Sequence, residues 1–117
     1  MLYFWGMIEN YFEYVNFAIT ISDKDGNIIY MNDKSKATFQ KDKPLIGANL
    51  KDCHQLKSWE KIQSLLTHKE TNVYTIEKNG VKKLIYQTPW YNSKNEVAGL
   101  IELSLIIPFE LPHFVRS

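Results

Sequence analysis

Two neighbouring residues, Cys53 and His54, carry the most reactive side chains in the sequence. A thiolate beside an imidazole is the nucleophile and base of cysteine hydrolases. Adjacent residues seldom direct their side chains at each other, and no Asp or Asn is placed to orient the histidine. We therefore do not expect an enzyme, although a small thiol enzyme using Cys53 stays an alternative. The simpler interpretation is a half-buried thiol beside a hydrogen-bonding histidine.

The same pair could also ligate a metal or haem iron. No Cys-x-x-Cys or His-x-x-x-His spacing, which is typical of closed metal sites, accompanies it. We predict no metal site, and a haem or redox sensor ligated through His54 is a second alternative. A single cysteine excludes an internal disulfide framework and fits a reducing compartment.

Composition narrows the class of protein further. The chain has 117 residues, 44% hydrophobic and 23% charged, which fits one soluble domain with a hydrophobic core. A formal net charge of +1 does not favour nucleic-acid binding. No apolar stretch is long enough to span a membrane, and the first residues lack the basic region of a signal peptide. We expect a cytoplasmic protein.

The first residues predict an amphipathic helix over residues 1–15. Phe4, Ile8, Phe12 and Val15 recur at helical spacing, and acidic residues occupy other positions around the wheel. The apolar stripe of this helix is unusually aromatic. Such a stripe needs a partner surface within the chain or on a second copy of it.

The remaining chain predicts five strands and several short helices. Strand candidates rich in β-branched and aromatic residues are 17–22, 28–31, 71–77, 82–91 and 97–107. Asp25-Gly26-Asn27 and Asn79-Gly80 supply the positive-φ residues of tight hairpin turns. Asn32 or Asp33 offers the cap of a short helix, and a longer helix carries Trp59, Ile62 and Leu66 on one face.

The last strand, 97–107, is apolar on both faces, which indicates that both are covered. Short helices can cover one face of the sheet. The N-terminal helix or a second copy of the protein would have to cover the other.

Three stretches of this sequence resemble the PAS domain family. Residues 21–32 are similar to its opening hairpin, which ends in an asparagine that starts the next helix. Residues 88–100 are similar to its closing hairpin, with a proline before the turn and a glycine after it. Leu45-Ile46-Gly47 matches a step between its short helices. The resemblance implies an α+β fold: a five-stranded antiparallel sheet with short helices on one face and an N-terminal helix that often mediates dimerisation. The expected division is helix 1–15, PAS-like domain 16–107 and tail 108–117.

The resemblance also implies a pocket and its lining. Positions two and four before Pro89, Gln87 and Ile85, face the pocket in this family. Gln87 is then a polar handle for a ligand, or it hydrogen bonds to the backbone of a neighbouring helix. The predicted pocket residues are His54, Trp59, Ile62, Leu66, Ile85, Gln87, Ile101 and Leu103.

Two cofactors known in the family, haem and flavin, require particular residues at these positions. Some members bind haem through a histidine in the region of His54, so haem stays open. Flavin photoreceptors carry a reactive cysteine where this chain has Leu50, and a glutamine where it has Ile101. Both departures argue against flavin.

We therefore predict a sensory or signal-transduction module that binds a small ligand or mediates a protein-protein interaction. It is expected to form a homodimer and to act on an unknown signalling partner in trans, unless the chain is excised from a longer protein. No nucleic-acid or membrane partner is expected. The predicted dimer residues are Phe4, Ile8, Phe12, Tyr86 and Trp90.

Overall fold

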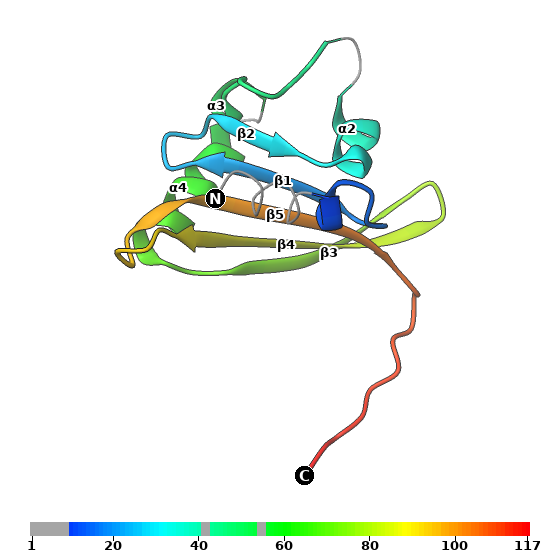
Figure 1. The fold of residues 1–117 in the computed structure, drawn as a ribbon. Coiled ribbons are helices and arrows are strands. Elements are labelled where there is room, and N and C mark those ends of the chain that lie inside the picture. The colour runs from blue at the N-terminus through cyan, green and yellow to red at the C-terminus, as the bar shows by residue number, and fades with distance from the viewer. Residues whose placement is uncertain (1–9, 41–42, 54–55) are drawn as a thin grey trace.

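The computed structural model describes residues 10–40, 43–53 and 56–117, which form an α+β fold around one antiparallel sheet (Figure 1). The strands are β1 (Ala18–Asp23), β2 (Ile28–Met31), β3 (Asn72–Lys78), β4 (Val81–Tyr91) and β5 (Val97–Ile107). The helices are α2 (Asp33–Phe39), α3 (Leu50–Cys53) and α4 (Leu56–His68). All five predicted strands are present, each beginning and ending within one residue of its predicted bounds. Of the predicted N-terminal helix, only residues 10–15 are described, and 10–13 of these are helical.

The strands lie in the order β2-β1-β5-β4-β3, so β5, which was predicted to be covered on both faces, is the central strand. Asn79 and Gly80 both have positive φ, 54° and 77°, as the predicted turn between β3 and β4 requires. Pro89 has no N–H to donate, and its position in β4 tolerates this. β3 pairs with β4 only as far as Gln87, so at the proline β4 is paired with β5 alone. After β5, residues 108–117 extend away from the domain (Figure 1).

The two faces of the sheet follow from the alternation along β5. Leu100 and Glu102 line a cavity between the sheet and the helical segments, and we call this side the inner face. Ile101 and Leu103, one position out of phase, lie on the outer face. Residues directly opposite on neighbouring strands share a face, so the register assigns the other strands in the same way.

The hydrophobic core lies on the inner face, between the sheet, α3 and α4. Its buried cluster comprises Ile28, Met31, Leu50, Trp59, Ile62, Leu65 and Leu100. The predicted apolar face of α4 is confirmed for Trp59 and Ile62, whereas Leu66 packs only at the margin of this cluster. The Trp59 ring packs on the bare backbone of Gly26, where an added Cβ would lie 2.6 Å from the ring.

Asn32, a predicted cap, is fully buried and its amide joins four backbone groups. Its Oδ1 accepts hydrogen bonds from the backbone N–H of Ser35 (3.0 Å) and of Ile19 (2.9 Å). Its Nδ2 donates to the carbonyls of Phe12 (2.9 Å) and Phe17 (2.8 Å). One side chain therefore caps α2 and ties that helix to β1 and to the chain that precedes β1.

We expect Asn32→Ala to lower the free energy of unfolding by about 2–4 kcal/mol, because buried backbone groups lose their only side-chain partner. Urea denaturation followed by circular dichroism measures this loss. The matched control is Asn92→Ala. Asn92 also makes three side-chain hydrogen bonds, to Lys94 and Glu96, but it is exposed. Its loss should cost about 1 kcal/mol or less, since water replaces the amide. Equal losses in the two variants would contradict the structural role assigned to Asn32.

Candidate functional site

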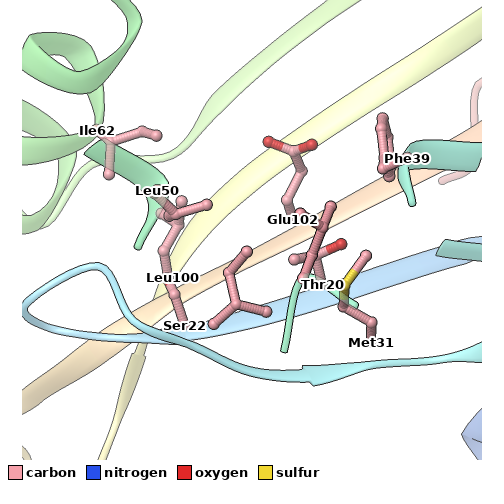
Figure 2. A pocket seen from close by; sticks show the side chains of 10 residues that line it. Thr20, Ser22, Met31, Phe39, Leu50, Ile62, Leu100 and Glu102 are labelled. Carbon is pink, nitrogen blue, oxygen red and sulfur yellow. The ribbon is translucent and has the colours of Figure 1, made fainter. Parts of the chain in front are cut away.

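A cavity of about 220 Å³ lies between the inner face of the sheet and the helical segments (Figure 2). Every layer of the domain contributes to its wall. The described residues that line it are Thr20, Ser22, Ile28, Met31, Phe39, Leu45, Leu50, Ile62, Leu100 and Glu102. Seven of these ten are apolar, which is typical of a small-molecule site with a few polar groups for orientation.

The wall opposite the sheet is fixed by the β1–β2 hairpin. The backbone N–H of Ile28 donates to the Ala48 carbonyl (2.8 Å), and that of Leu50 donates to the Gly26 carbonyl (2.7 Å). The N–H of Gly47 in turn donates to the Ile28 carbonyl (2.7 Å). These bonds hold the segment that carries Leu45 and Leu50 against the hairpin, so both leucines keep their place in the wall.

Glu102 is the only charged residue among the described residues of the wall. Figure 2 shows its carboxylate standing away from β5 into the cavity, between Leu50 on one side and Phe39 on the other. The residue is half-buried. A carboxylate in apolar surroundings is costly unless partners compensate it, so its contacts matter.

The partners of Glu102 form a polar row across the inner face. Asn72, Gln87, Glu102 and Thr20 lie directly opposite one another on β3, β4, β5 and β1. The Asn72 amide donates to Gln87 Oε1 (2.9 Å), and Gln87 Nε2 donates to Glu102 Oε2 (2.8 Å). At the other end, Thr20 Oγ1 hydrogen bonds to Ser35 Oγ of α2 (2.5 Å).

This polar row orients the Glu102 carboxylate through one oxygen and leaves the other oxygen able to accept a further hydrogen bond. Gln87 donates to Glu102 Oε2, and Asn72 holds the Gln87 amide in turn. Within the described part of the chain, Glu102 Oε1 accepts no hydrogen bond. Tyr74 lies on the inner face of β3, and its pKa is raised by burial and by the negative charge of Glu102.

The structure gives Gln87 a different role from either one predicted. It is buried on the inner face, as the resemblance implies. Its amide, however, hydrogen bonds to two side chains of the sheet, Asn72 and Glu102, and not to the backbone of a helix. Gln87 therefore supports the carboxylate of Glu102, and Glu102 is the charged group that lines the cavity.

Ile101 and Leu103 do not line this cavity, which corrects the predicted lining. Both lie on the outer face, because Leu100 and Glu102 point inward and side chains alternate along a strand. Ile62 does line the cavity. Trp59 and Ile85 are buried nearby without reaching its wall, and Leu66 packs at the margin of the core. His54 lies outside the described residues.

Glu102 and most of the apolar wall were missed from the sequence. The available signal was one carboxylate in a mostly apolar final strand, on the same face as Leu100 and Ser104. The wall residues from loops and short helices, such as Phe39 and Leu45, carry no local pattern that points to a cavity.

The predicted dimer residues fall in two groups. Tyr86 and Trp90 lie on the outer face of β4, and Phe12 is 45% exposed. Phe4 and Ile8 lie outside the described residues. Trp90 is also engaged within the domain, because its indole N–H donates to the Ser22 carbonyl (2.9 Å).

No group of three or more His, Cys, Asp or Glu residues that could hold a metal ion occurs in the described ranges 10–40, 43–53 and 56–117. No helix in those ranges is long and apolar enough to cross a membrane.

Several solved structures share this fold. The PAS domain of the histidine kinase ThkA is 25% identical, with a TM-score of 0.63 over 75% of this chain and 96% of that one. The C-terminal domain of a Streptococcus mutans protein is 18% identical, with a TM-score of 0.71 over 86% of this chain and 83% of that one. A PAS domain from Colwellia psychrerythraea is 21% identical, with a TM-score of 0.65 over 89% and 97%.

No curated protein matches the sequence significantly. A family profile described as a PAS domain matches residues 8–107, which is most of the chain and includes the whole sheet. The sheet order, the short helices on its inner face and the similar structures agree with that match. The chain belongs to the PAS domain family.

Proposed function

We propose that this PAS sensory domain binds a small molecule in the cavity between its sheet and helices. The observation that carries the proposal is an apolar cavity of about 220 Å³ with one oriented carboxylate in its wall. Protein interiors are normally packed with few voids larger than a water molecule. A cavity of this kind is therefore typical of a binding site.

The size of the cavity limits the ligand. Sites for drug-sized molecules occupy about 300–1,000 Å³. A cavity of about 220 Å³ suits a smaller molecule, with roughly one ring or one short branched chain. The wall favours a ligand with an apolar body and one polar group that meets Glu102.

The alternatives through Cys53 and His54 remain separate hypotheses. A haem or redox sensor ligated through His54 would lose its haem in a His54→Ala variant, and full haem content in that variant would reject it. A thiol enzyme would lose turnover in a Cys53→Ser variant, and unchanged turnover would reject it. Neither hypothesis rests on the cavity described above.

Native mass spectrometry of the protein purified from its own cells tests the proposal. We expect added mass from a small molecule on the wild type and much less on Leu45→Trp, which places an indole in the cavity wall. Steric overlap between this indole and the ligand that costs ~1.4 kcal/mol lowers the affinity for the ligand about tenfold. The matched control is Ile46→Trp, because Ile46 is adjacent, 45% exposed and not part of the wall. A wild type without added mass, or equal loss in both variants, would contradict ligand binding in this cavity.

We also propose that the outer face pairs with a second copy of the chain. Tyr86 is 38% exposed there, beside the half-buried Ile101 and Leu103 of the central strand. Aromatic side chains on an apolar face are enriched at protein interfaces. The exposed Phe12 would extend the same aromatic surface.

Analytical ultracentrifugation tests this pairing. Tyr86→Glu should weaken the dimer about tenfold or more, because it buries a charge at the centre of the interface. Ile106→Glu is the control, since Ile106 is 68% exposed but lies on the opposite side of β5. A wild-type protein that stays monomeric at high concentration would reject the dimer.

A further inference from the structure

The electrostatics of the cavity wall are unbalanced. Glu102 contributes a carboxylate, and no lysine, arginine or histidine is among the described residues of the wall. The nearby phenol of Tyr74 is neutral at physiological pH, as tyrosine ordinarily is, and burial and Glu102 raise its pKa further. A carboxylate among apolar groups gains most from a partner of opposite charge.

Two lysines on the same side of the sheet, Lys34 and Lys83, do not supply that charge. Lys34 and Lys83 line a different cavity, of about 210 Å³, together with Ser104 and Ile106. Lys83 lies opposite Ile106, four residues along β5 from Glu102. No ion pair joins either lysine to Glu102 in the described part of the chain.

The geometry of Glu102 is set up for one further hydrogen bond. Gln87 holds its Oε2 at 2.8 Å, and Asn72 holds Gln87 in turn. Oε1 belongs to the same fixed carboxylate and is left without a partner from the described residues. The support thus comes from two neighbouring strands and not from a flexible surface group.

We propose that the cavity recognises a small organic cation: a protonated amine or amidine with a compact apolar body. The cationic N–H donates to Glu102 Oε1, and the apolar body packs against Leu50, Ile62 and Leu100. This inference rests on the proposed function and names the chemical class of its ligand. A charged hydrogen bond in this setting should favour the cation over a neutral ligand of the same shape by about tenfold to a hundredfold.

Three ligands of one shape test the inference: benzylamine, benzyl alcohol and benzoate. Each is titrated into the isotope-labelled full-length protein, and dissociation constants are taken from the shifts of the Leu50, Ile62 and Leu100 resonances. We expect benzylamine to bind at least about tenfold more tightly than benzyl alcohol, with benzoate weakest. This comparison uses the wild type, so it does not depend on whether any variant folds.

Two variants test whether the preference for benzylamine over benzyl alcohol comes from Glu102 and its support by Gln87. Glu102→Gln should bring benzylamine to the affinity of benzyl alcohol while leaving the alcohol unchanged. Gln87→Leu keeps the carboxylate but removes its support, so it should reduce the amine-to-alcohol ratio partially. Glu60→Gln removes an exposed carboxylate of α4 and should leave the ratio unchanged.

The outcomes separate this inference from the proposed function. If benzyl alcohol shifts the cavity residues as strongly as benzylamine, the cation inference is overturned and ligand binding stands. An amine preference that survives Glu102→Gln also overturns it. If none of the three ligands shifts Leu50, Ile62 or Leu100 at millimolar concentration, both the inference and the proposed cavity function are contradicted.

Discussion

A single buried amide, that of Asn32, holds together the parts of the domain that meet beside the cavity. It bonds to the start of α2, to β1 and to the chain before β1 through four backbone groups. Buried backbone groups without partners are costly, so an arrangement of these segments that broke these bonds without replacing them would be disfavoured. Because Asn32 sets where α2 begins, it also sets where Ser35 meets Thr20. The position of one end of the polar row therefore depends on this cap.

The other constraint on the site is the register of the sheet. Asn72, Gln87, Glu102 and Thr20 form a row only because four strands align at one level. A slip of one residue would turn Glu102 to the outer face and an isoleucine or leucine inward. Gly99 helps to fix the alignment, since any Cβ there would lie 1.9 Å from the Ser22 carbonyl. The close approach of β1 and β5 at that point admits only glycine.

Local signals were sufficient for the elements of the fold. The turn at Asn79-Gly80 and the cap of α2 each depend on a few neighbouring residues; the turn was predicted, and the cap was predicted at Asn32 or Asp33 and lies at Asn32. The resemblance placed Ile85 and Gln87 on the correct face. The faces of β5 were reversed because Leu100, Ile101 and Leu103 are all apolar, so alternation alone does not say which side is inward. Glu102 was the residue that could have decided it.

The cavity wall itself was beyond sequence reasoning for a physical reason. Phe39, Leu45 and Leu50 come from segments whose positions depend on backbone hydrogen bonds to the distant hairpin. Such long-range hydrogen bonds depend on how the loops fold back onto the hairpin. They leave no periodic pattern in the sequence. The same holds for Gln87, whose partners Asn72 and Glu102 are each 15 residues away in the sequence.

Ser22 connects the two faces of the sheet. Its side chain lines the cavity on the inner face, while its carbonyl accepts the Trp90 indole N–H, whose ring lies on the outer face. A displacement of β1 by a group entering the cavity would change that hydrogen bond, although Trp90 touches no ligand. Such a displacement would register in the resonance of the Trp90 indole proton, so occupancy of the interior would be readable from the opposite surface without any added label.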